Sequence, residues 1–285
     1  MYKIIKVANH LGASARGTDK GSDVIIKSLS LKNVIEIDIP KENKKHAYGK
    51  YQKVKNLPEV KEANFKLINA IKKVIKSRDT PIILQGDDSS IIGIEYGLHQ
   101  SLDEPFGIIY LDAHGDINTP ETTISGCLFG QGLAHLIGLG HPKLLELNKN
   151  QAATSHKNLV LIGQRNLDSG EAELIKEKNI SLFKPKQVHK NIKSILRQIK
   201  NKFEENKIKK VYLHIDQDVV DPSLSGASLC QEQNGINDKE LFSIVKYMKE
   251  NFEICALSIG NYLPSIDNDK KTMKIIKKVL DIVMN

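Results

Sequence analysis

The fold of this chain is decided by the stretch Phe106-Gly107-Ile108-Ile109-Tyr110-Leu111-Asp112-Ala113-His114-Gly115-Asp116. Its apolar half, 106–111, predicts a buried β-strand. Three side chains that bind metals well follow at every second position. Residues two apart in an extended backbone point to the same side, so Asp112, His114 and Asp116 are expected to converge at the end of the strand. The sequence therefore predicts a metal site there.

Strand-like and helix-like segments alternate along almost the whole chain. The expected strands are 2–8, 34–39, 81–85, 106–112, 159–163, 180–183, 211–216 and 252–259, and the main expected helices are 22–31, 58–76, 90–100, 133–139, 168–178, 188–206, 238–251 and 269–284. In the second of these helices, Phe65 is counted with Val60 and Ile68 in the apolar stripe. This alternation predicts an α/β fold with a mostly parallel sheet between two layers of helices. With neither a repeat nor a linker in the sequence, one domain is expected over residues 1–285.

Composition narrows the possible classes of partner and cellular compartment. The net charge is +8, but the lysines are scattered over expected helices and loops and there is no Trp, so we expect no nucleic-acid partner. No apolar run approaches the ~18 residues of a membrane span, and no signal peptide is recognisable. The three cysteines are widely spaced, without a CxxC motif, which argues against a disulfide framework and a thiolate zinc site. We expect a cytoplasmic protein.

Two further acidic motifs follow expected strands, Gly86-Asp87-Asp88-Ser89 and Asp216-Gln217-Asp218-Val219-Val220-Asp221-Pro222. Either motif alone is also typical of a turn or a helix cap. Together with the first stretch they favour metal binding, because sites in such sheets form beyond the carboxyl ends of strands. The predicted ligands are Asp88, Asp112, His114, Asp116, Asp216 and Asp218. Six ligands, mostly oxygen, suit two divalent ions, and they favour manganese over zinc or copper. The predicted cofactor is two Mn²⁺ per chain.

The motifs resemble those of the ureohydrolase family, which contains arginase, agmatinase and formimidoylglutamase, and arginase is the nearest branch. The resemblance covers nearly the whole chain, through Arg16-Gly17 with Gly21, and through 84–89, 112–126, 163–171 and 216–222. It implies an eight-stranded parallel sheet, a dimanganese centre and hydrolysis of a guanidino or amidino C–N bond in a small-molecule substrate. It also implies a homo-oligomer, a trimer or a hexamer.

Three positions depart from the family pattern. Asp88 stands at the position of a metal-binding histidine, Phe129 at that of a proton-shuttle histidine, and Asn261 at that of the glutamate that pairs with the guanidinium. Loss of one partner of a buried charge pair costs roughly 3–5 kcal/mol. We therefore expect weak or altered arginine hydrolysis. The alternative is a catalytically impaired protein that binds a metabolite or a partner.

The resemblance also indicates the remaining site residues. Asp116 is expected to act in catalysis as well as in metal binding, and His135 is the candidate replacement for the missing proton shuttle. The expected substrate-binding residues are Asn118, Ser125, Cys127, Phe129, Asp168, Glu171, Asn237 and Asn261. A two-metal phosphoesterase was the third possibility, but its motifs occur in a different order and its GNH motif has no counterpart here.

Overall fold

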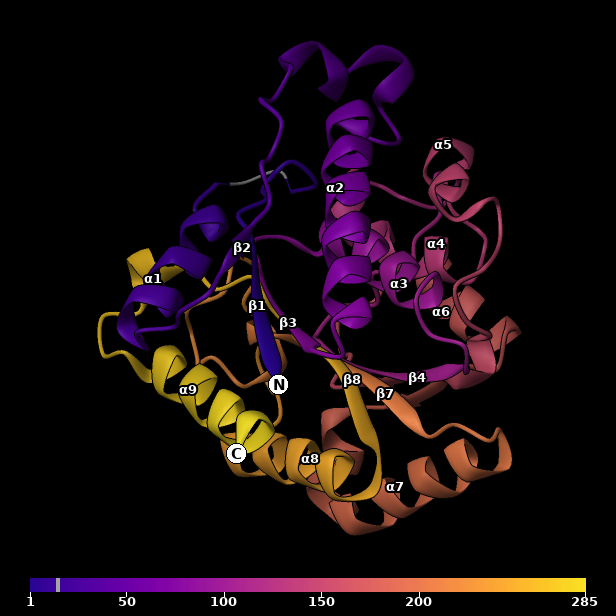
Figure 1. Cartoon of the computed structure of the whole chain (residues 1–285). Helices are drawn as coiled ribbons and strands as arrows, with labels where there is room; N and C mark the ends of the chain where they lie inside the picture. Colours follow the sequence, from indigo (N-terminus) through magenta and orange to yellow (C-terminus); the bar gives the residue numbers. More distant parts are fainter. Residues whose placement is uncertain (14–15) are drawn as a thin grey trace.

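The fold is built on one sheet of eight parallel strands in the order β2-β1-β3-β8-β7-β4-β5-β6, as a computed structural model describing residues 1–13 and 16–285 shows (Figure 1). The strands are β1 (Tyr2–Val7), β2 (Ile35–Glu36), β3 (Thr80–Gln85), β4 (Phe106–Leu111), β5 (Leu159–Ile162), β6 (Ser181–Phe183), β7 (Lys210–Asp216) and β8 (Glu253–Gly260). The α-helices are α1 (Gly21–Ser28), α2 (Leu57–Lys76), α3 (Ile91–His99), α4 (Gly132–Leu136), α5 (Pro142–Leu145), α6 (Ser169–Glu177), α7 (Pro185–Glu205), α8 (Asp238–Asn251) and α9 (Lys271–Met284).

Helices cover both faces of this sheet. Helices α2, α3, α4 and α6 pack on one face, and α1, α7, α8 and α9 pack on the other (Figure 1). The central strands are buried on both sides, as the near-continuous apolar runs predicted. The expected three-layer α/β/α fold is confirmed. Among the described residues, no helix combines the length and the apolar character that crossing a membrane requires.

Two details differ from the sequence-based expectations. Strand β2 has only two residues instead of 34–39, although the Ile37 N–H still bonds to the Lys6 carbonyl at 2.9 Å beyond its end. The assignment of Phe65 to the core was wrong, because its side chain is 55% exposed. A helix turns about 100° per residue, so Phe65 lies about 140° around the axis from Val60 and leaves the buried stripe.

The strand order brings the predicted ligand motifs together. Strands β3, β8, β7 and β4 are neighbours at the centre of the sheet, and all four run in the same direction. The three acidic motifs follow β3, β4 and β7, and Asn261 follows β8 directly. Four segments that are distant in sequence therefore end side by side.

Candidate metal centre

The six predicted ligands converge at the carboxyl ends of β3, β4 and β7. Their potential ligand atoms fall into overlapping groups, and within each group the atoms lie within 4.8 Å of one another. One group is Asp112, His114 and Asp218, another is Asp88, Asp112 and Asp116, and a third joins Asp88 and Asp216 to His214. The structure therefore brings the six predicted ligands together. It also places His214, which was not predicted, beside Asp88 and Asp216.

The first group is organised by the backbone around His114. The Asp112 carboxylate accepts the His114 backbone N–H at 2.6 Å, and the Asp218 carboxylate accepts the Ala113 N–H at 2.9 Å. The ring Nδ1 of His114 lies 3.1 Å from Asp218 Oδ2 and 3.5 Å from Asp112 Oδ1. Burial opposes a charge on this ring, yet the bonds and charges of Asp112 and Asp218 raise the pKa of His114 far above its usual range. Three donors thus face one point.

Asp88 is shared by the second and third groups and is 1% exposed. Its Oδ1 accepts a hydrogen bond from Gln85 Nε2 at 2.7 Å. The side-chain amide of Asn261 donates to both Asp88 Oδ2 and Asp216 Oδ2. The positive end of an amide dipole therefore bridges two carboxylates, in a place suited to a cation. Asn261 holds this position with a left-handed backbone, φ +56°, and its N–H bonds to the Gly86 carbonyl at 2.9 Å.

His214 is the site residue that sequence reasoning missed. It lies in β7, is 0% exposed, and its Nε2 is 3.4 Å from Asp88 Oδ1. Burial lowers the pKa of its imidazole to about 3. A signal was available: His214 precedes Asp216 by two residues in an extended strand, so both side chains leave the same face.

The donor set fits divalent cations. Five carboxylates, those of Asp88, Asp112, Asp116, Asp216 and Asp218, are each at most 3% exposed. Burial first, and mutual repulsion second, raise the pKa values of Asp88, Asp112 and Asp216 well above the usual range. A cluster of this kind is costly to ionise unless cations compensate it. The buried Nε2 of His214, which has no hydrogen-bond partner among the described residues, points to the same conclusion.

Asp116 completes the group that contains Asp88 and Asp112. It adopts a left-handed backbone, φ +49°, and its Oδ2 accepts the Tyr110 hydroxyl at 2.5 Å. Burial raises the pKa of Asp116 to about 6, although the neighbouring His114 charge acts in the opposite direction. An aspartate can adopt such a conformation more easily than most residues, and local strain of this sort is common at functional sites.

Similarity to known proteins identifies the family of this chain. The sequence profile of the Arginase family matches residues 2–284. The chain belongs to the arginase family. It is similar to the arginase of Bacillus caldovelox, with 30% identity over 282 residues, 95% of this chain and 94% of that protein. The native structure of that arginase at pH 5.6 superposes with a TM-score of 0.91 at 28% identity, over 100% of this chain and 98% of the other.

The arginase-family fold also extends to a more distant relative. Formimidoylglutamase from Bacillus subtilis shares the fold with a TM-score of 0.77 at 17% identity, over 99% of this chain and 85% of the other. Together these matches confirm the resemblance to ureohydrolases and the arginase-like fold.

In this arginase-family chain, three of the expected substrate-binding residues form one connected group. Asn118 Nδ2 donates to Asp168 Oδ2 at 2.9 Å, and Glu171 Oε2 accepts the Asp168 backbone N–H at 2.9 Å. The other oxygen of Glu171 accepts the Ile117 N–H at 3.1 Å. Burial, followed by the charge of Asp116, raises the pKa of Glu171 to about 7. Asn118 lies two residues along the chain from Asp116, so the group borders the candidate centre.

Little empty space remains next to the carboxylates of the candidate centre. The cavity there measures about 10 Å³, room for about one water molecule. Phe129, Asn261, Leu229 and Cys230 line it together with the predicted ligands. Burial raises the pKa of the Cys230 thiol to about 11. A molecule larger than water therefore fits only if these lining residues move.

Of the other expected substrate contacts, the loop pair Ser125 and Cys127 stays apart from the cavity lining. Ser125 is exposed, and its hydroxyl accepts the N–H of the buried Cys127 at 3.2 Å. Both residues belong to the segment that leads to Phe129, which is the member of this segment that reaches the cavity. Their contact with a substrate stays a prediction.

Two of the expected site residues, His135 and Asn237, lie away from the cavity lining. His135 was the candidate proton shuttle, but it is 0% exposed, its Nδ1 donates to the Gln131 carbonyl at 2.8 Å and its Nε2 accepts the His141 N–H at 2.9 Å. Both of its nitrogens are bonded inside the protein, and its role in proton transfer stays a prediction. Asn237, another expected substrate contact, forms a capping box with Glu240 at the start of α8, as Asp168 does with Glu171 at the start of α6, and its contact with substrate stays a prediction. Neither residue is among the described residues that line the cavity.

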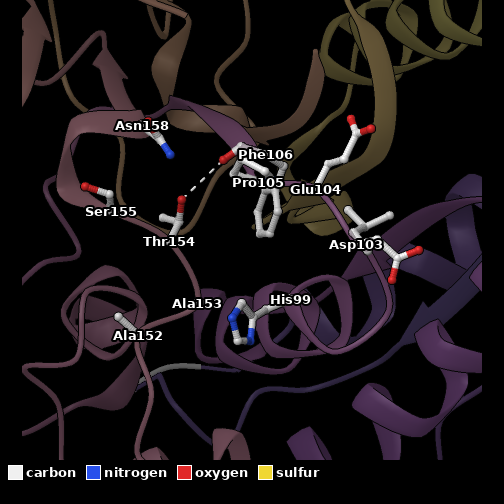
Figure 2. Close-up of a pocket in the computed structure, with 11 residues that line it drawn as sticks. His99, Asp103, Glu104, Pro105, Phe106, Ala152, Ala153, Thr154, Ser155 and Asn158 are labelled. Atoms are coloured by element: carbon white, nitrogen blue, oxygen red, sulfur yellow. Dashed lines mark hydrogen bonds between the residues drawn. The ribbon is translucent and has the colours of Figure 1, made fainter. Parts of the chain in front are cut away.

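A larger cavity, of about 540 Å³, lies at the amino end of β4 (Figure 2). His99, Phe106 and Asn158 are in its wall, where the Thr154 hydroxyl donates to the Phe106 carbonyl at 3.2 Å. Phe106 begins β4 whereas Asp112 follows its end, so this cavity lies at the opposite edge of the sheet from the candidate centre. Its size alone does not make it the active site, because the ionisable cluster lies elsewhere.

Proposed function

We propose that this protein is a binuclear manganese-dependent hydrolase of a guanidino or amidino C–N bond, with weak or altered activity toward arginine. Membership of the arginase family makes it a metal-dependent hydrolase acting on C–N bonds. The observation that carries the finer proposal is the convergence of all six predicted ligands at one sheet edge. The arginases named above act, by their names, on arginine, and the differences at this site argue for another preference.

The predicted ligands would hold the two ions. They are Asp88, Asp112, His114, Asp116, Asp216 and Asp218. Two bound divalent ions would lower the pKa of a water molecule and polarise the carbon that it attacks. The protein itself contributes rigid placement, because each ligand follows a central strand and several carboxylates are fixed by backbone N–H groups.

Recognition of the substrate is divided between two sides of the centre. The connected group of Asn118, Asp168 and Glu171 offers acceptors and an amide for an α-amino-acid end. On the other side, Asn261 presents a neutral amide and Phe129 an apolar ring. A neutral amide cannot pair with a guanidinium charge, and Phe129 cannot donate a proton to a leaving amine. At 1.4 kcal/mol per decade, the missing pair costs about two to three orders of magnitude in arginine turnover.

The decisive experiment is a turnover screen with protein purified and assayed in manganese. Release of urea or ammonia would be measured with arginine, agmatine, guanidinobutyrate, guanidine and a set of amidino compounds, and bound metal would be measured in the same samples. We expect two ions per chain and turnover of at least one compound other than arginine. Fully loaded protein that turns over none of them would overturn the proposal.

A catalytically impaired, ligand-binding protein is the second candidate. Two observations favour it: the cavity of about 10 Å³ and the Asn261 amide that already bridges Asp88 and Asp216. The two candidates differ in a calorimetric titration with arginine or ornithine. Heat of binding without turnover would support the binding role.

We also propose the identity of the metal, the cellular location and the oligomeric state. The choice of manganese rests on oxygen-rich ligation. A cytoplasmic location agrees with the sequence, which has three unpaired cysteines among the described residues. A trimer or a hexamer follows from the family resemblance, and sedimentation of the purified protein would test it.

A further inference from the structure

His214 stands in the wall of the candidate centre with one nitrogen directed into it. Its side chain is 0% exposed and leaves β7 on the same face as Asp216. Within residues 1–13 and 16–285, its Nε2 has no hydrogen-bond partner. The nearest carboxylate oxygen, Asp88 Oδ1, is 3.4 Å away, which is longer than an ordinary N–H···O bond of about 2.9–3.0 Å. A buried polar atom left without a partner calls for an explanation.

The ring of His214 is held in this orientation from two sides. Across the sheet, it pairs in register with Tyr110 of β4 and with Ser258 of β8. It stacks on the Tyr110 ring with centroids 4.3 Å apart and an interplanar angle of 17°. On the other side, its Nδ1 lies 2.8 Å from the Ser258 hydroxyl. Both contacts come from neighbouring strands, and together they fix the direction of Nε2.

We propose that His214 is a metal ligand, binding one of the two ions through Nε2 together with Asp88 and Asp216. The potential ligand atoms of these three residues lie within 4.8 Å of one another. Donors bound at about 2.1 Å on opposite sides of an ion are about 4.2 Å apart, so only a small contraction is needed. The inference rests on the proposed dimetal function and deepens it.

The arrangement replaces an imidazole that the chain has lost. Asp88 stands at the position where the resembled family has a histidine ligand. His214 returns a nitrogen donor to the same ion from the adjacent part of the sheet. Each ion then has one imidazole and at least two carboxylates: Asp112, His114 and Asp218 for one, and Asp88, His214 and Asp216 for the other. The two sets also mirror each other in sequence, Asp-x-His in one and His-x-Asp in the other.

Ser258 is the positioning residue in this arrangement. For Nε2 to offer its lone pair to a metal, Nδ1 must carry the proton and donate it to Ser258 Oγ. The same hydroxyl lies 2.6 Å from the Tyr212 hydroxyl, to which it can donate in turn. Metal-binding histidines commonly donate their second ring N–H to an acceptor in this way, and loss of such an acceptor costs about 10–100-fold in metal affinity.

The test measures metal binding and does not depend on activity. Full-length protein is stripped with chelator, titrated with Mn²⁺ by calorimetry, and analysed for bound metal after desalting. We expect two ions in the wild type. In His214→Asn one ion should bind at least about 100-fold more weakly while the other is unchanged, and Ser258→Ala should weaken the same ion about 10–100-fold. The matched control is His135→Asn, which removes a buried histidine whose nitrogens are both bonded within the protein.

The outcomes separate this inference from the proposed function. Wild type that binds two ions, with both affinities unchanged in His214→Asn, would overturn the role of His214 and leave the dimetal proposal standing. Wild type that binds none would overturn both. Asp88→His combined with His214→Ser returns the imidazole to position 88, and it should recover the second ion.

A second measurement uses only the wild-type protein, so it tests the inference even if His214→Asn does not fold. Wild-type protein loaded with Mn²⁺ and labelled with ¹⁵N on histidine should show, in pulsed electron paramagnetic resonance, couplings to two imidazole nitrogens, from His114 and His214. Coupling to a single nitrogen in the fully loaded wild type would overturn the inference.

Discussion

Removal of metal should lower the stability of this protein by an amount that follows from its two donor groups. The groups around Asp88 and His114 are assembled from the ends of separate strands, so the unfolded chain cannot reproduce them. An ion present at one hundred times its dissociation constant stabilises the native state by about 2.7 kcal/mol, and two such ions by about 5.4 kcal/mol. For 285 residues, the entropy of unfolding is about 0.6 kcal/mol per kelvin. The expected fall in Tm is therefore about 9 °C.

Differential scanning calorimetry in chelator and in a series of Mn²⁺ concentrations measures this shift. The Asp112→Asn variant sharpens the test, because it removes a buried carboxylate shared by two of the ligand groups. We expect the metal-free variant to be more stable than the metal-free wild type, since one buried like charge is gone, and its response to Mn²⁺ to be reduced. A Tm that is equal in chelator and in saturating Mn²⁺ would refute the reasoning. A metal-free Asp112→Asn variant less stable than the wild type would contradict the electrostatic part.

Three other predictions concern separate parts of the structure. Burial raises the pKa of Glu95 above the unfolded value of 4.5, so the native state holds this proton more tightly than the unfolded chain. The free energy of unfolding therefore falls as pH rises above that value, by up to about 1.4 kcal/mol per pH unit. Glu95→Gln should be more stable than the wild type at pH 7, as denaturant titrations at several pH values would measure. Arg165 donates to the carbonyls of Gly163, Asp218, Glu232 and Gln233, so Arg165→Lys should lower the free energy of unfolding by about 2–3 kcal/mol, and an unchanged denaturation midpoint would count against this anchoring role. Phe129→His combined with Asn261→Glu should raise urea release from arginine about 100-fold or more, while no gain in the metal-loaded double variant would place the block at Asp88 or in the closed cavity.

The small cavity at the candidate centre would restrict which substrates the proposed hydrolase can bind. Phe129 is carried by the loop before α4, and Leu229 and Cys230 by the segment after β7. In the proposed hydrolase, a guanidino compound would have to displace these side chains, and the Asn261 amide would have to leave Asp88 and Asp216 when the ions bind. Selection among substrates would then depend on the cost of opening the site as well as on its charges.

The sequence alone was sufficient for the fold class and for the convergence of six candidate ligands at one edge of the sheet. Period-two ligand spacing after an apolar run, as in Asp112, His114 and Asp116, is a local property, because strand geometry alone sets the directions of these side chains. The convergence of separate motifs followed from a general rule about the carboxyl ends of parallel strands. The departures at Asp88, Phe129 and Asn261 were also visible in the sequence, since each is a change of residue type within a motif.

Only the tertiary structure decided the rest, because it depends on which strands are neighbours. The place of His214 is set by Tyr110 and Ser258, which are distant in sequence and come beside it only through the order β8-β7-β4. Packing likewise placed His135 away from the cavity lining and gave both of its nitrogens partners that no spacing rule reveals. Local pattern determines the direction of a side chain, whereas long-range strand pairing determines what that side chain meets.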